Sequence, residues 1–152
     1  MKTLKTNFVL ILFFLAGLLS FSQENVVVKD AETAYNKMLV LFNSGDYEAY
    51  GNHVMDNIEC YTGVYTPLLW EGKVNWMNFI NGLKNYAYVN YNFRQPSYRS
   101  FGNNTVICNG YFVFTTTDKN GVTEVQTGRQ STLLIKSEGI WKIANNHFSS
   151  MF

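Results

Sequence analysis

The side chains best suited to chemistry lie near the C-terminus of this 152-residue chain. His147 is one of only two histidines, and a two-residue spacing puts it on the same strand face as Ile143 and Asn145. Because imidazole titrates near neutral pH, a histidine that faces a pocket can act as an acid, a base or a hydrogen-bond donor. No nucleophile or carboxylate partner follows from the sequence, so a histidine hydrogen-bonded within the core is the alternative.

Arg129 is the second candidate. It alternates with Ser131 and Leu133 in a strand-like segment. An inward guanidinium there would bind an anionic or carbonyl ligand through paired hydrogen bonds. An ion pair with Glu124 at the surface is the alternative. Together with His147 it forms the predicted catalytic pair, and Asn145 on the inward register would add an amide to the site.

Aromatic residues make up 16% of the chain and supply the rest of the predicted site. Tyr61, Trp70 and Trp76 fall where a short hairpin and a helix would frame the mouth of a pocket. Aromatic walls with a few polar groups suit a flat or hydrophobic ligand. Core packing explains Trp76 equally well.

Composition excludes several classes of function. Lys and Arg number 12 against 11 Asp and Glu, so a net charge of +1 does not support nucleic-acid binding. We expect no metal and no other cofactor. The two cysteines, Cys60 and Cys108, are too few for a disulfide scaffold, and they are either buried thiols or a single bonded pair.

The N-terminal residues predict an export signal. Lys2 and Lys5 precede an apolar stretch at residues 8–19, which is too short for a membrane span. Ser20 and Ser22 are small residues at the right positions for cleavage before Gln23. We therefore predict a signal peptide at residues 1–22, a domain at residues 23–152, a secreted or periplasmic protein and no membrane span after cleavage. An uncleaved N-terminal anchor is the alternative.

The remaining elements predict an α+β fold. Apolar positions repeat every three or four residues over residues 28–43, and a short second helix and a third with Trp76 and Ile80 on one face follow. The period then changes to two over four long segments, residues 86–101, 105–117, 122–136 and 140–149, with short Gly-containing turns between them. Shorter strands are expected at residues 57–62 and 67–70. Helices followed by such strands form helical layers on one face of a curved antiparallel sheet.

Both faces of the sheet carry apolar residues. Tyr111 and Val113 alternate with Phe112 and Phe114. A sheet with two apolar faces must cover both of them. We therefore predict a homodimer through the sheet face that the helices leave open.

Several motifs in order carry a family resemblance. The segments 128–135, 139–143 and 147–149 resemble the closing hairpin of SnoaL-like proteins, in the nuclear transport factor 2-like superfamily. The ending is also similar to the association domain of calcium/calmodulin-dependent kinases, whose His-x-His-x-Ser pattern is matched here by His147 and Ser149, with Asn145 at the first histidine. Gly45-Asp46 resembles the junction between the family's first two helices, and Gly72 the opening of its third.

The resemblance implies a cone-shaped fold in which three N-terminal helices pack on a curved antiparallel sheet. It does not settle activity, because isomerases, dehydratases, cyclases and binding proteins share this scaffold. Ketosteroid isomerases carry a tyrosine and a carboxylate at positions that Met38 and Thr62 occupy here, so we exclude that branch.

Three hypotheses for function follow. The first is an exported domain that binds a small, partly apolar molecule. The second is a pocket enzyme of isomerase, dehydratase or cyclase type that uses His147. The third is a non-catalytic module for oligomerisation or partner binding.

Overall fold

The structure is a computed structural model that describes residues 26–62 and 69–150. The predicted signal peptide and residues 67–68 of the predicted short strand lie outside these ranges. The described helices are residues 26–43, α2 (Tyr47–Gly51), α3 (Lys73–Gly82) and a 3-10 turn, η1 (Leu83–Asn85). The strands are β1 (Val54–Thr62), β2 (Leu69–Glu71), β3 (Tyr88–Ser100), β4 (Thr105–Thr117), β5 (Thr123–Ser137) and β6 (Ile140–Ser150). No helix in the described ranges is long and apolar enough to cross a membrane.

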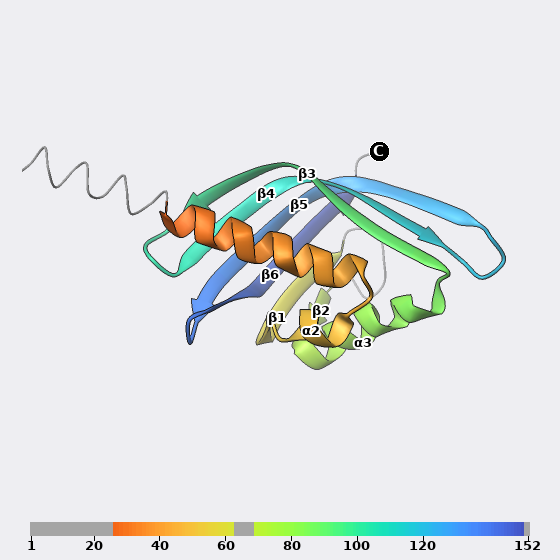
Figure 1. Cartoon of the computed structure of the whole chain (residues 1–152), viewed down its shortest axis with the longest axis horizontal. Coiled ribbons are helices and arrows are strands. Elements are labelled where there is room, and N and C mark those ends of the chain that lie inside the picture. Colours follow the sequence, from red (N-terminus) through yellow and green to blue (C-terminus); the bar gives the residue numbers. More distant parts are fainter. Residues whose placement is uncertain (1–25, 63–68, 151–152) are drawn as a thin grey trace, which may run out of the picture.

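The strands form one curved sheet in the order β2-β1-β6-β5-β4-β3. Figure 1 shows the helix of residues 26–43 lying across one face of this sheet, with α2 and α3 gathered at one of its ends. The other face, which we call the outer face, carries no described helix. The α+β prediction is therefore confirmed. One detail is corrected: β1 pairs with β6 in parallel, whereas the other neighbours are antiparallel.

The first helix packs on the sheet through one apolar stripe. Ala31, Tyr35, Met38 and Phe42 are buried at the predicted spacing of three and four residues. Burying such side chains stabilises the fold by about 1.5–3 kcal/mol for each large one. This stripe and the inward residues of the sheet form a single core.

A sharp turn then sends the chain back toward the sheet. Gly45 has φ +77°, a conformation that glycine adopts without strain. Asp46 accepts a hydrogen bond from the Ala49 amide at 3.1 Å and so caps α2. The turn brings the rings of Phe42 and Tyr50 to within 5.7 Å of each other.

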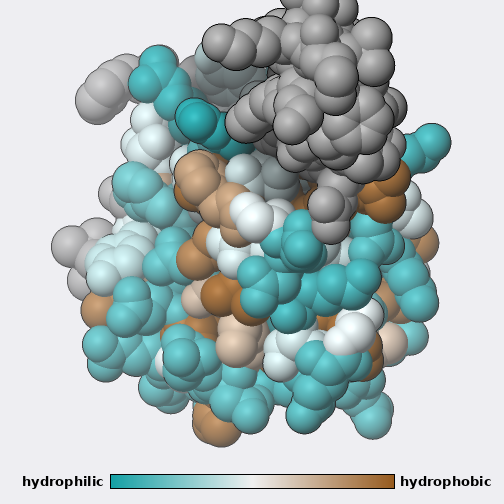
Figure 2. Space-filling view, turned by 90° about the vertical axis from the view of Figure 1, so that its left-hand side faces the viewer, coloured by the Kyte–Doolittle hydropathy of each residue, from teal (hydrophilic) through white to brown (hydrophobic). Residues whose placement is uncertain are grey.

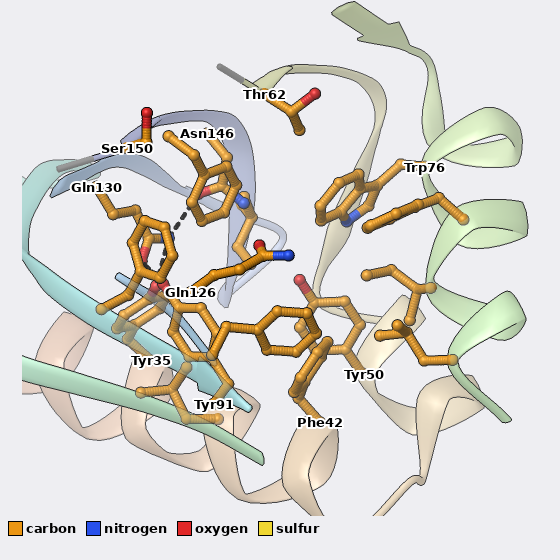
Figure 3. Close-up of a pocket in the computed structure, with 18 residues that line it drawn as sticks. Tyr35, Phe42, Tyr50, Thr62, Trp76, Tyr91, Gln126, Gln130, Asn146 and Ser150 are labelled. Carbon is orange, nitrogen blue, oxygen red and sulfur yellow. Dashed lines mark hydrogen bonds between the residues drawn. The ribbon is translucent and has the colours of Figure 1, made fainter. Parts of the chain in front are cut away.

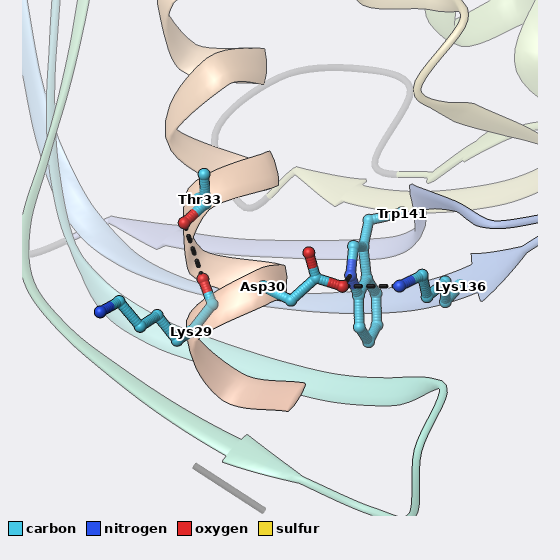
Figure 4. A network of polar contacts seen from close by, with 5 residues as sticks. All are labelled: Lys29, Asp30, Thr33, Lys136 and Trp141. Atoms are coloured by element: carbon cyan, nitrogen blue, oxygen red, sulfur yellow. Dashed lines mark hydrogen bonds and ion pairs between the residues drawn. The ribbon is translucent and has the colours of Figure 1, made fainter. Parts of the chain in front are cut away.

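A polar contact fastens the other end of the first helix (Figure 4). Asp30 Oδ2 accepts hydrogen bonds from Lys136 Nζ at 2.6 Å and from the Trp141 indole N–H at 2.9 Å. Both bonds lower the pKa of the Asp30 carboxyl, and the bond from Lys136 has the larger effect. The helix is thus held at this end by the closing hairpin of β5 and β6. Around this end of the molecule hydrophilic residues predominate on the described surface, with hydrophobic ones interspersed (Figure 2).

The pairing of β5 with β6 contains an irregularity that decides which side chains face inward. Leu133 pairs with Asn145, but the next residue, Leu134, pairs with Ile143, so Ala144 is an extra residue on β6. Such a β-bulge reverses the alternation of the strand beyond it. Trp141 and Ile143 are buried before the bulge, whereas after it Asn146 is buried and His147 is exposed.

The bulge overturns the predicted shared face. We expected His147 and Asn145 to follow Ile143 inward by strict two-residue spacing, and this prediction is wrong.

The two cysteines are both free and buried, so no disulfide joins them in this structure.

Candidate functional site

A cavity lies between the first helix, α3 and the inner face of the sheet (Figure 3). It holds about 830 Å³ of space free of atoms, including open solvent at its mouth. The lining residues are Tyr35, Leu39, Phe42, Tyr50, Thr62, Trp76, Phe79, Ile80, Leu83, Tyr91, Phe112, Phe114, Gln126, Gln130, Ile143, Asn146, Phe148 and Ser150.

Aromatic rings build the wall on the sheet side. Tyr91 from β3 and Phe112 from β4 stack with their centroids 5.8 Å apart and their planes at 15°. Phe148 from β6 meets Phe112 edge to face at 5.6 Å. Gly128 makes room for this arrangement, since a Cβ atom there would lie 2.6 Å from the Phe112 ring. Rings so constrained by their neighbours form a preformed apolar surface.

A buried polar network closes the cavity beside this wall. Gln130 Nε2 lies 3.0 Å from the Tyr35 hydroxyl, 2.8 Å from Thr132 Oγ1 and 3.2 Å from Asn146 Oδ1. Tyr91 donates its hydroxyl hydrogen to Gln130 Oε1. Thr132 in turn donates to Asn146 Oδ1 at 2.7 Å. These groups satisfy one another, so the network holds the strands in place without a ligand.

The cavity carries no formal charge over the described residues. Its 18 lining side chains include no Asp, Glu, Lys, Arg, His or Cys. The ionisable groups among them are Tyr35, Tyr50 and Tyr91, and burial raises the pKa of each above the usual value for tyrosine. All three are therefore neutral at physiological pH.

Of the six predicted ligand-binding residues, the structure places one in the cavity. Trp76 lines it and is 4% exposed. Trp70 is half-buried and packs on Phe79, with centroids 5.1 Å apart, but does not line the cavity. The mouth position predicted for Trp70 is therefore wrong, because its ring is covered by α3.

The other four predicted residues lie outside the cavity. Tyr61 and His147 are neighbours in the β1–β6 pairing, both exposed, with ring centroids 6.3 Å apart. Arg129 is exposed on β5 and pairs with Tyr111 on the outer face. Asn145 sits at the bulge and Asn146 takes the inward position. Placing these four side chains in the pocket is therefore wrong.

The predicted residues on β5 and β6 miss the cavity because their side chains lie on the outer face of the sheet. On β5 the inward residues are Gln130, Thr132 and Leu134 rather than Arg129, Ser131 and Leu133. Burial of a guanidinium without a partner would be costly, whereas an amide can satisfy itself in a network. On β6 the bulge shifts the inward positions by one residue. The acid–base hypothesis for His147 and Arg129 consequently has no support from the described cavity.

The polar cavity-lining residues that the sequence analysis did not predict are Gln130, Asn146 and Tyr50. The paired amides at Asn145-Asn146 are visible in the sequence, but nothing in it says which one faces inward. Among the described residues no group of three His, Cys, Asp or Glu side chains could hold a metal ion.

The comparison with known families decides the classification. The family model described as SnoaL-like domain matches residues 31–152. The chain belongs to the SnoaL-like domain family. No curated protein sequence matches the chain.

Solved structures show the same fold. A nuclear transport factor 2-like superfamily protein from Salmonella enterica is 19% identical at TM-score 0.71, covering 84% of this chain and 93% of that one. A candidate scytalone dehydratase from Novosphingobium aromaticivorans is 10% identical at TM-score 0.75, covering 84% and 87%. The association domain of calcium/calmodulin-dependent kinase II from C. elegans is 18% identical at TM-score 0.66, covering 84% and 98%. At these identities the likeness concerns the SnoaL-like fold alone.

Proposed function

We propose that this SnoaL-like protein binds a small, uncharged and largely apolar molecule in its cavity. The observation that carries the proposal is that no charged side chain is found among the described residues that line the cavity. A ligand charge moved from water into this site would meet no counter-ion and would lose its hydration. A neutral ring system would instead contact the rings of Tyr91, Phe112 and Phe148.

A matched pair of dyes tests the charge requirement. N-phenyl-1-naphthylamine is neutral, and 8-anilino-1-naphthalenesulfonate has the same ring skeleton with one negative charge. We expect the neutral dye to bind at micromolar concentration and the sulfonate at least ~100-fold more weakly, because the cavity offers it no cation. Fluorescence titration measures both affinities.

Two arms of the same titration complete the test. Ser150→Trp, at an exposed lining position, should weaken binding of the neutral dye about tenfold by filling space, whereas Lys37→Glu on the exposed side of the first helix should not.

The affinity for the neutral dye should stay constant between about pH 5 and pH 9, since the raised pKa values keep the tyrosines neutral. Preferential binding of the sulfonate, or a titration near the pKa of histidine, contradicts the proposal.

We also propose that the protein is exported with residues 1–22 as a cleaved signal. The support is the dozen apolar residues after Lys2 and Lys5 and the small residues before Gln23. N-terminal sequencing of the protein from its own host tests this proposal. Gln23 as the first residue supports it, and an intact Met1 contradicts it.

We further propose a homodimer through the outer face of the sheet. One row of paired residues crosses this face, from Arg99 on β3 through Ile107, Leu133 and Asn145 to Glu59 and Glu71. Glu59 and Glu71 are exposed and directly opposite each other, and like charges in that position destabilise a strand pair. If two sheets pack through their outer faces about a two-fold axis parallel to the strands, the partner's Arg99 lies against Glu59 and Glu71.

Charge reversal tests this arrangement. Arg99→Glu should weaken dimerisation at least tenfold, because it sets a third carboxylate against two others across the interface. The triple variant Arg99→Glu, Glu59→Lys, Glu71→Lys should restore the dimer, and Lys37→Glu should leave it unchanged. Sedimentation velocity measures the dissociation constant. A monomeric wild-type protein, or an unaffected Arg99→Glu dimer, overturns the proposal.

A further inference from the structure

One buried polar atom in the cavity wall has no partner within the described chain. Trp76 is 4% exposed and lines the cavity, and its indole N–H finds no acceptor in hydrogen-bonding geometry. Buried donors are almost always satisfied, since an unmade hydrogen bond loses the bond that water would have provided. A donor that lacks a partner and lines a cavity is suited to a ligand atom.

A second polar group lies beside it. The Tyr50 hydroxyl is close enough to Trp76 for the indole N–H to oppose, in part, the rise that burial causes in the pKa of Tyr50. Tyr50 is 5% exposed and also lines the cavity. Figure 3 shows the Tyr50 hydroxyl, the Trp76 indole nitrogen and the Gln126 amide directed toward the same part of the cavity.

The position of the Trp76 ring is fixed by its neighbours. Phe79, one turn along α3, stacks on Trp76 with centroids 5.4 Å apart and planes at 30°. Phe79 also packs against Trp70, with ring centroids 5.1 Å apart. Rotating the Trp76 ring to find another acceptor would break this stack. The indole N–H is therefore held ready for an atom in the cavity.

The polar groups at the two ends of the cavity differ in whether they already have hydrogen-bond partners. At one end Gln130 and Asn146 are engaged in the internal network and need nothing from a ligand. At the other end the Trp76 N–H is unmatched and the Tyr50 hydroxyl can donate as well. A bound molecule is best oriented with its apolar body against the first end and one acceptor atom at the second.

We propose that the ligand is a neutral ring compound with one acceptor oxygen, a ketone or ether, which receives hydrogen bonds from Trp76 Nε1 and the Tyr50 hydroxyl. This inference rests on the proposed function and adds the chemical class of its ligand. A charged carboxylate is excluded by the same lining that carries no cation. Trp76 and Tyr50 thus set both the orientation and the specificity of binding.

A pair of model ligands isolates the acceptor oxygen. α-Tetralone carries one ketone on a two-ring skeleton, and tetralin is the same skeleton without oxygen. We expect the wild-type protein to bind α-tetralone about tenfold more tightly than tetralin, equivalent to about 1.4 kcal/mol. Competition with N-phenyl-1-naphthylamine, whose affinity is first measured for each variant, gives both constants.

Three variants test which donors are responsible. Trp76→Phe and Tyr50→Phe each remove one donor while keeping a ring, and each should lower the tetralone preference at least threefold with little change in tetralin affinity. Trp70→Phe is the matched control: its indole N–H is also buried without a partner, but Trp70 does not line the cavity. Trp70→Phe should keep the full preference. Thermal melts confirm that each variant is folded, and Tyr50→Phe alone decides if Trp76→Phe is not.

The outcomes separate this inference from the proposed function. Equal binding of α-tetralone and tetralin by the wild type overturns the inference and leaves the apolar site intact. Loss of the preference in Trp70→Phe as large as in Trp76→Phe also overturns it. Failure of the dye and of both model ligands to bind overturns the proposed function and the inference with it.

Discussion

The extra residue Ala144 on β6 is the constraint on which the rest of the site depends. Strict alternation would carry the buried face of Trp141 and Ile143 on to Asn145 and His147. The bulge instead turns Asn146 inward and puts His147 on the outer face. One inserted residue therefore replaces a titratable lining with an amide that completes the network of Gln130. The chemistry of the cavity is set by strand register.

The neutral lining then determines what the cavity can do. Buried tyrosines and amides supply hydrogen bonds but no group that changes charge near neutral pH. Part of this polarity is already used in holding the strands together, and only the Trp76 and Tyr50 end is left to a ligand. Arg99, Glu59 and Glu71 lie instead along one row of the outer face. The sheet thus separates the uncharged cavity from these charged residues.

Much of the fold could be predicted from the sequence because its signals are local. The four long strands follow from two-residue periodicity and Gly-containing turns, and β4 begins and ends at the predicted residues, Thr105 and Thr117. The stripe from Ala31 to Phe42 follows from helical spacing. The site could not be predicted because the sequence does not show whether the odd-numbered or the even-numbered residues of β5 and β6 face inward. Asn145 and Asn146 are chemically identical, and the bulge that selects between them arises from the pairing with β5, a non-local contact.

Cysteine labelling tests the register and the cavity together most directly. His147→Cys and Phe148→Cys are compared for their rate of reaction with a polar maleimide, with and without N-phenyl-1-naphthylamine; the native Cys60 and Cys108 are both 0% exposed. The account predicts that Cys at position 147 reacts at the rate of an exposed thiol regardless of dye. At position 148 the reaction should be slower, and dye should slow it further, at least fivefold. Protection of position 147 by dye, with position 148 unprotected, would contradict the register and the site built on it.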